Sequence, residues 1–291
     1  MAASKTVAVT GATGRQGGAV ARALLAEGWR VRGLTRNPSR KRARALSARG
    51  VEIVRADMDD PASLLRAFSG VHGVFSVQNF MISGIEGEVR QGRNVAEAAE
   101  RAAVEHLVYA SAGPGERGTG IGSWESKLDV EERLRELELP VTVLRPTAFM
   151  ELMTDPAFYP AVGVWHVWPK LAGGSFEVPW LCCRDLGVIA EKAFADPARF
   201  VGRDLVLAAD RRSLDECRQI YAQVFGREPK RFPMPVWMLE RFAPDTVALW
   251  RWTAATRFDA DLRVALAIHP AALDVAAWLE QRKAAPEQTS A

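Results

Sequence analysis

The chain has 291 residues, of which 48% are hydrophobic and 25% charged, a composition typical of a soluble globular protein with one large domain or one and a half. Its net charge of +3 does not by itself argue for nucleic-acid binding, and no apolar run approaches the roughly 18 residues that span a bilayer. Three cysteines without metal-ligand spacing (Cys182, Cys183 and Cys217) and an N-terminus without a secretory pattern predict a cytoplasmic protein with free thiols.

A glycine turn follows the first predicted strand. An apolar run predicts a strand over residues 6–10, glycines follow at Gly11, Gly14 and Gly17, and apolar periodicity predicts a helix over 15–27. In this order the first glycine permits a tight turn, the second lets the backbone approach a pyrophosphate, and the third lets the helix pack against the sheet. The unpaired N–H groups of the helix N-terminus favour phosphate. We therefore expect a dinucleotide here; the alternative is a glycine-rich loop without a ligand.

Strands and helices alternate over the first 150 residues. Further strands are predicted over 30–34, 52–55, 73–77, 105–110 and 141–144, and further helices over 39–49, 61–68, 86–103 and 125–137. Such alternation predicts an α/β fold, a Rossmann-type doubly wound parallel sheet with helices on both faces. Ligands bind at the carboxyl ends of such strands, so the residues after each strand form the candidate site in a domain over residues 1–150.

The end of the second strand bears on the choice of cofactor. An acid there would bond the ribose 2′-hydroxyl of NAD(H), but the chain has Arg36 and Asn37, with Lys41 nearby. Arginine binds phosphate through charge-assisted, often bidentate hydrogen bonds. NADP(H) is therefore the expected cofactor. Eight basic residues and no acid lie from Arg30 to Arg49, and we interpret part of this run as a solvated helix face.

The later strand ends supply the rest of the expected site. Asp57 and Met58 follow the third strand and are placed to contact adenine, and the ribose and nicotinamide side is expected at Gln78, Asn79 and Phe80 after the fourth strand. After the fifth strand comes Ser111. Its hydroxyl either donates a hydrogen bond to a substrate or caps the turn.

Aromatic side chains crowd the second half of the chain. Residues 151–283 are expected to form a smaller α/β substrate region, with helices over 184–195, 213–225, 238–242 and 272–283 and short strands near 176–178 and 205–207. Trp124, Trp165 and Trp168 are expected to cover the nicotinamide and to favour a flat, apolar substrate, with His166 as a further contact. The alternative is that these rings form interdomain core. Residues 284–291 are expected to be a disordered tail.

Several segments together resemble a known family. They are TGATGRQGG (10–18), VRGLTRNPS (31–39), ADMDD (56–60), VRQGRNVAEAA (89–99), VYASAG (108–113), WESK with Lys127, LRPTAFME (144–151) and HPAALDVAAWLEQ (269–281). In these segments the chain is similar to the NmrA-like family of atypical short-chain dehydrogenases/reductases. The resemblance implies a Rossmann-fold NADP(H) site with cofactor roles for Gly11, Thr13, Gly14, Arg15, Gln16, Gly17, Arg36, Asn37, Lys41, Asp57, Gln78, Lys127 and Phe149, the last also on the substrate side.

The proton donor of the usual reaction is missing. Ordinary short-chain dehydrogenases use a Tyr-x-x-x-Lys pair, whose tyrosine exchanges a proton with the substrate oxygen during hydride transfer. Here Ser123 stands four residues before Lys127. A serine hydroxyl is a much poorer acid than a phenol, which argues against ordinary alcohol–ketone interconversion. Hydride transfer to a quinone, enone, imine or dye remains compatible, with a proton from water or from Lys127.

Two functions are open, because the family contains NADP(H)-sensing regulators as well as NADPH-dependent reductases. The leading hypothesis is a reductase of a small hydrophobic or aromatic acceptor, with Lys127 and Ser111 as candidate catalytic residues. The alternative is a non-catalytic redox sensor that regulates a protein partner. We expect no metal, nucleic acid or membrane as partner, and a homodimer is left open.

Overall fold

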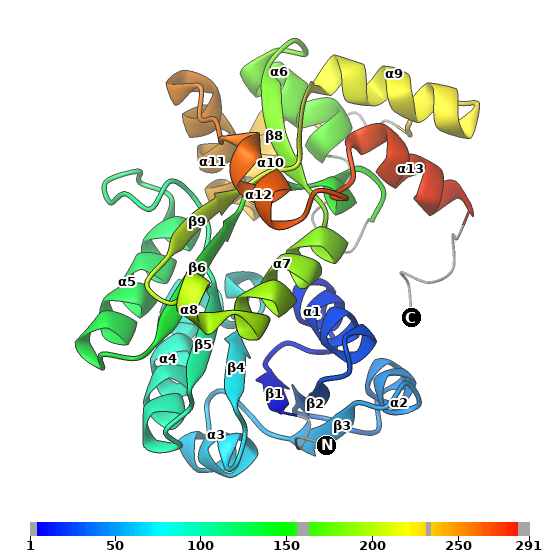
Figure 1. Cartoon of the computed structure of the whole chain (residues 1–291). Helices are drawn as coiled ribbons and strands as arrows, with labels where there is room; N and C mark the ends of the chain where they lie inside the picture. The colour runs from blue at the N-terminus through cyan, green and yellow to red at the C-terminus, as the bar shows by residue number, and fades with distance from the viewer. Residues whose placement is uncertain (1–4, 156–162, 231–233, 285–291) are drawn as a thin grey trace.

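The computed structural model describes residues 5–155, 163–230 and 234–284. Its centre is a seven-stranded sheet in the order β3-β2-β1-β4-β5-β6-β9 (Figure 1). The strands are β1 (Thr6–Val9), β2 (Arg30–Thr35), β3 (Glu52–Arg55), β4 (Gly73–Ser76), β5 (His106–Ala110), β6 (Val141–Pro146) and β9 (Asp204–Leu207). All neighbouring pairs are parallel. The strand order reverses between β1 and β4, which is where doubly wound sheets bind ligands.

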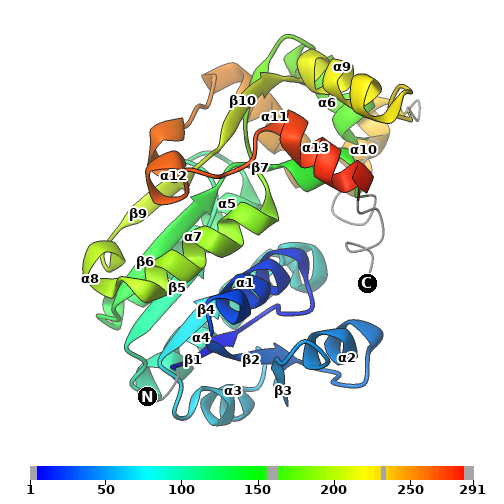
Figure 2. The same cartoon turned by 45° about the vertical axis from the view of Figure 1, so that its right-hand side comes forward.

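Helices cover both faces of this sheet. Figure 2 shows α1 (Arg15–Ala26) and α7 (Cys183–Ala195) side by side on one face. The other helices of this unit are α2 (Lys41–Ser47), α3 (Pro61–Phe68), α4 (Phe80–Arg101) and α5 (Gly122–Glu136). Successive strand residues point to opposite faces, so Val7 and Val9 pack in the cluster under α1 and α7, whereas Ala8 packs in the cluster under α3, α4 and α5.

A second, smaller unit lies over the carboxyl ends of the strands (Figure 1). Its three-stranded sheet has the order β10-β8-β7, formed by β7 (Ala148–Phe149), β8 (Glu177–Leu181) and β10 (Asp210–Ser213). Its helices are α6 (Trp168–Ala172), α9 (Leu214–Phe225), α10 (Val236–Phe242), α11 (Pro244–Thr256) and α13 (Val275–Ala284). They enclose a buried cluster of their own, which contains Trp165, Trp168, Trp180, Trp250 and Trp278.

The chain returns to the large sheet after residue 150, and this corrects the expected domain boundary. Helix α7, the short helix α8 (Pro197–Phe200) and strand β9 belong to the first unit, where β9 pairs with β6. Helix α12 (Leu262–Ile268) packs on β9. Without β9, the outer edge of β6 would present unpaired backbone groups. The first unit therefore contains residues from both sides of position 150: its first six strands precede it, and α7, α8 and β9 follow it.

Most predicted elements of the first half lie where the sequence places them, but helix α4 starts six residues earlier than expected. Asn79 caps it, since its side-chain oxygen accepts a hydrogen bond from the Met81 N–H at 2.9 Å. A break at Gly84 (φ 75°) separates this first turn from the main helix.

The expected disordered tail lies outside the described residues except for residue 284, which ends α13.

Candidate functional site

The glycine turn between β1 and α1 has the geometry that its three glycines predict. Gly11 adopts a positive φ of 58°, and its carbonyl accepts a hydrogen bond from the Gly14 N–H at 2.8 Å. A Cβ on Gly17 would lie 2.5 Å from the Gly11 oxygen, which no side chain tolerates. Helix α1 starts with Gly14 as its N-cap residue and without a side-chain cap. Its first N–H groups are therefore directed at the turn, as a phosphate site requires.

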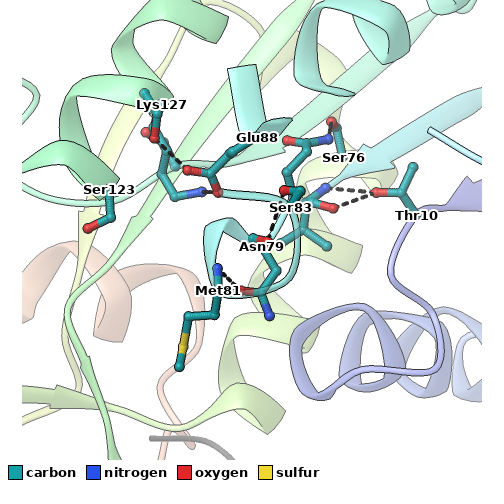
Figure 3. A network of polar contacts seen from close by, with 12 residues as sticks. Thr10, Ser76, Asn79, Met81, Ser83, Glu88, Ser123 and Lys127 are labelled. Atoms are coloured by element: carbon teal, nitrogen blue, oxygen red, sulfur yellow. Dashed lines mark hydrogen bonds and ion pairs between the residues drawn. The ribbon is translucent and has the colours of Figure 1, made fainter. Parts of the chain in front are cut away.

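Thr10 joins the turn to the neighbouring strand at the switch point. Its hydroxyl accepts a hydrogen bond from the Val77 N–H at 2.8 Å and donates to the Val77 carbonyl at 3.1 Å (Figure 3). The carboxyl ends of β1 and β4 are thereby held together. This places the glycine turn beside the segment 78–80 that the sequence assigns to the ribose and nicotinamide side.

Arg36 directly follows β2 and Lys41 is the first residue of α2, and both side chains are exposed. Asn37 turns the chain between them, since its side-chain oxygen accepts hydrogen bonds from the Ser39 N–H at 3.1 Å and from the Ser39 hydroxyl at 2.6 Å. The Asn37 oxygen is thus used within the loop, and the two cations are left exposed to solvent.

Two glutamine oxygens expected at the cofactor are buried. Gln16 Oε1 and Gln78 Oε1 have no hydrogen-bond partner among the described residues. The Gln78 amide nitrogen donates to Ser76 Oγ at 3.0 Å and lies 3.8 Å from the sulfur of Met58, so Gln78 and Met58 meet. Buried acceptors without a partner are costly, and a ligand with hydroxyl or amide donors would satisfy both. The Asp57 side chain instead accepts a hydrogen bond from the Asp59 N–H at 3.1 Å.

Arg15 and Phe149 make contacts between the two units. The Arg15 guanidinium forms an ion pair with Asp155, which lies beyond the turn Met150–Met153. Phe149 in β7 is buried in the core cluster that also contains α1 and α7. Phe80, the first residue of α4, is half-buried. The sequence alone did not single out Asp155, because an acid in a loop carries no signal of its distant partner.

Lys127 lies in a buried polar cluster between α4 and α5. Its ammonium is 3.1 Å from Oε1 of Glu88, whose side chain is fully buried. The Ser126 hydroxyl donates to the other Glu88 oxygen at 2.5 Å. Figure 3 shows the Lys127 ammonium directed at Glu88. Sequence reasoning missed Glu88, which reads as an ordinary acid in a charged helix. Ser123 is buried nearby, and its N–H donates to Asp245 Oδ1 at 3.1 Å.

Ser111 belongs to a different network, which corrects its expected substrate role. Its hydroxyl donates to Glu131 Oε1 at 2.6 Å and accepts from Arg145 Nη1 at 3.1 Å. Arg145 is buried and also bonds Glu131 and Asp204, at 2.7 and 2.6 Å. The Ser111 hydroxyl therefore helps to satisfy a buried arginine, because a buried charge requires close polar partners.

The expected substrate-binding tryptophans divide into two groups. Trp165 and Trp168 are core of the second unit: the Trp165 N–H donates to the Met153 carbonyl at 3.0 Å, and Trp168 stacks on Trp250 at 5.0 Å. Both rings are buried in this core cluster, which is the alternative that the sequence left open, and their substrate role stays a prediction. Next to them, His166 accepts a hydrogen bond from the Lys170 ammonium at 2.9 Å.

Trp124, by contrast, lies where the two units meet. It belongs to α5 in the first unit and makes an edge-to-face contact of 5.2 Å with Trp252 of α11 in the second. A Cβ on Gly113 would lie 2.6 Å from the Trp124 ring, so the loop after β5 also packs on it. Trp124 is the one of the three expected substrate tryptophans that connects the Lys127 helix with the second unit.

Neither a metal cluster nor a membrane span is found in the part of the chain that the structure describes. No three His, Cys, Asp or Glu side chains there gather as metal ligands would. None of the described helices combines the length and apolar character needed to cross a bilayer.

Comparison with known proteins agrees with this geometry. The fold and the glycine turn define a Rossmann-type protein of the dinucleotide-binding kind. The model of the NmrA-like family matches residues 3–264. The NmrA-like family domain-containing oxidoreductase FrzB of Cladobotryum sp is 31% identical over 258 residues, covering 79% of this chain and 77% of its own. The chain belongs to the NmrA-like family.

Two solved structures have the same fold. Citrobacter sp. triphenylmethane reductase, complexed with NADP(H), has a TM-score of 0.76 at 21% identity, over 95% of this chain and 99% of its own. NmrA, a negative transcriptional regulator, in complex with NADP, has a TM-score of 0.75 at 20% identity, over 98% and 97%. One of these proteins is an enzyme and the other a regulator.

Proposed function

We propose that this protein binds NADP(H) across the carboxyl ends of β1 and β4. The glycine turn would hold the pyrophosphate, and Gln16 and Gln78 would accept hydrogen bonds from the cofactor through their unpartnered oxygens. Family membership and the NADP-bound neighbours support this assignment. Arg36 and Lys41 would hold the 2′-phosphate, which favours NADP(H) over NAD(H) because both are exposed cations in the connection from β2 to the start of α2.

The reaction that the site supports best is NADPH-dependent reduction of a small hydrophobic or aromatic acceptor. NADPH, when bound, supplies a hydride. The single observation that carries the proposal is the Lys127 ammonium, which is mostly buried and fixed by Glu88 beside the switch point. A held ammonium can orient the cofactor ribose or give a proton to the reduced acceptor without a tyrosine at position 123.

The aromatic side chains indicate the class of acceptor. Trp124 and Trp252 meet between the two units, and Met81 and Ile82 at the start of α4 expose 52% and 69% of their surface. Flat apolar molecules bind such surfaces by burying area and stacking on rings. Quinones, enones, imines and cationic dyes are the acceptors of this class that accept hydride.

The experiment is an absorbance assay of NADPH loss with one acceptor from each class. Wild-type protein should turn over at least one acceptor, and Lys127→Met should lose most of that turnover while its NADP+ affinity stays within a few-fold. Lys192→Met is the matched control, because Lys192 is a half-buried lysine on α7, on the opposite face of the sheet. Tight NADP+ binding without turnover of any class would refute the reductase.

A regulator is the second candidate, and Ser123 favours it. The residue that would be a tyrosine in an ordinary dehydrogenase is a buried serine whose N–H binds Asp245. On α10, Trp237 and Phe242 are 70% and 80% exposed, and exposed aromatics often anchor protein partners. Light scattering and pull-down with and without NADPH test this function. An unchanged mass and partner set would count against it.

The cytoplasm is the compartment that we propose for this protein. Cys182, Cys183 and Cys217 are all buried free thiols. Burial raises the pKa of both Cys182 and Cys183, so neither is a reactive thiolate and the adjacent pair is not a redox centre. Free thiols are typical of reducing compartments.

A further inference from the structure

A groove between α1 and α2 contains three arginines that the proposed cofactor contacts do not use. It opens beside the glycine turn and has a volume of about 50 Å³. One water needs only roughly 10–15 Å³, so a small polyatomic ion fits. Thr13, Gly14 and Gly18 line one side, and the arginines are Arg22 on α1, Arg42 on α2 and Arg49 just after α2.

The charges around this groove are unbalanced. Its lining contains no acidic residue, and the nearby Glu52 is paired with Arg32 at 3.1 Å. Within the described ranges no hydrogen bond or ion pair engages the guanidinium groups of Arg22, Arg42 or Arg49. Partial desolvation and the like charge of Arg49 lower the pKa of Arg22, and the carboxylate of Glu151 only partly offsets this. An anion in the groove would remove this repulsion.

The lining also has the right chemistry for phosphate in particular. Guanidinium groups present planar donor pairs that match phosphate oxygens bidentately. The hydroxyl of Thr13 can donate a further hydrogen bond. All three arginines are solvent-exposed, so a ligand can reach them from outside.

We propose that the groove between α1 and α2 binds a phosphate group through Arg22, Arg42 and Arg49. The phosphate belongs either to a separate molecule or to NADP(H); in the second case the groove, and not Arg36 and Lys41 as proposed above, holds the 2′-phosphate. The site is distinct from Arg36 and Lys41, and it requires no catalytic activity of the protein.

Calorimetric titration with inorganic phosphate, NADP+ and NAD+ tests the site at constant ionic strength. Arg42→Gln and Arg49→Gln are the test variants, and Arg44→Gln is the matched control, because Arg44 is an exposed arginine of α2 outside the groove. Wild-type protein and the control should bind phosphate, and each test variant should bind it at least tenfold more weakly.

The two sources give different results with the cofactors. If the groove holds the 2′-phosphate, each test variant loses tenfold or more in NADP+ affinity, keeps its NAD+ affinity, and phosphate competes with NADP+. If it holds a separate molecule, phosphate binds protein saturated with NADP+, and NADP+ affinity changes less than threefold. Phosphate and NADP+ affinities equal to wild type in both test variants would overturn the proposal, whatever the outcome of the reductase assay.

Discussion

The Nε of Arg15 donates a hydrogen bond to Oδ2 of Asp155 at 2.5 Å. Arg15 is the first residue of helix α1 at the glycine turn, and Asp155 belongs to the second unit. The exposed fractions of the two side chains are only 20% and 12%, so this pair is well shielded from solvent. It connects the phosphate end of the proposed cofactor site with the unit that would cover the substrate.

The first prediction follows from this pair. Asp155 places a negative charge next to the Arg15 guanidinium, which we propose lies at the pyrophosphate, so Asp155→Asn should bind NADP+ about three- to tenfold more tightly, roughly 1 kcal/mol. Fluorescence titration measures the affinity. Asp259→Asn, which breaks the exposed pair with Arg211, should leave it unchanged. Weaker binding by Asp155→Asn would mean that the pair supports the site rather than competing with the cofactor.

The second prediction concerns cofactor selectivity. Arg36→Asp should lower NADP+ affinity about 10- to 100-fold, since one charge-assisted hydrogen bond contributes about 1.5–3 kcal/mol. NAD+ affinity should stay within about threefold. Titration of both cofactors measures this, with Arg44→Asp as the control for general charge. If the preference for NADP+ persists, the 2′-phosphate is selected elsewhere.

The third prediction compares two glycine-to-alanine substitutions, one that would clash with the backbone of the glycine turn and one that would only strain its own backbone. In Gly17→Ala the new methyl would lie 2.5 Å from the Gly11 oxygen, so the turn must move and NADP+ affinity should fall at least tenfold. Gly70→Ala imposes a side chain at φ 70° with no atom within 4 Å. It should cost about 1–2 kcal/mol of stability without changing affinity. Urea denaturation and titration of both variants distinguish the effects, and equal affinities would contradict the role of Gly17.

The fourth prediction is that the stability of the protein depends on pH through Glu151. This residue belongs to the turn Met150–Met153, and its side chain accepts a hydrogen bond at 3.0 Å from the N–H of Cys183, the first residue of α7. Burial raises the pKa of Glu151 from 4.5 to about 7 in the folded protein. The folded state therefore binds the proton more strongly, and this stabilisation is present below pH 4.5 and is lost as the pH rises through 7.

Replacement by glutamine should remove that dependence. Glu151→Gln keeps an acceptor for the Cys183 N–H but cannot ionise. Wild type should lose about 2–3 kcal/mol of its free energy of unfolding to this ionisation between pH 4.5 and 8. The variant should not, so its stability relative to wild type should rise by that amount. Urea denaturation of both proteins across this range measures the difference. Parallel pH profiles would show that Glu151 ionises in the folded protein as it does in the unfolded chain.

The fifth prediction treats Glu88 as the positioning residue of Lys127. Glu88→Gln should lower kcat at least tenfold but change NADP+ affinity less than threefold, and Glu88→Asp should restore part of kcat because it keeps the charge. Glu97→Gln is the control, since it removes an acid of the same helix that pairs with Arg133. If kcat falls only in proportion to the loss of folded protein, the role of Glu88 is structural.

The fold could be predicted from sequence wherever one residue decides the local structure. Gly11 is required by its positive φ and Gly17 by the nearby Gly11 backbone, and the alternating strands of the first half follow from short-range periodicity. The strand near residues 205–207 was predicted, but its place beside β6 was not, because four residues carry no sign of pairing across sixty residues of chain. Helix α11 was missed because its apolar residues face both the core and Trp124 of the first unit.

The candidate site divides in the same way. The exposure of Arg36 could be predicted from its position after β2, and its role at the 2′-phosphate stays a prediction. Ser111 could not be assigned, since its partners Glu131 and Arg145 approach it only in the folded chain. Trp165 and Trp168 were expected in a pocket because the spacing of aromatic residues is the same in a core and in a ligand site.

The late position of β9 also constrains the order of folding. Six strands of the large sheet are complete by residue 146, but the seventh follows only at residues 204–207, after β8, α7 and α8. During synthesis from the N-terminus, β6 therefore remains an open edge until the chain has grown by about sixty residues. Non-local pairing of this kind is slow to form, and a fragment ending near residue 150 should associate through that edge rather than stay monomeric.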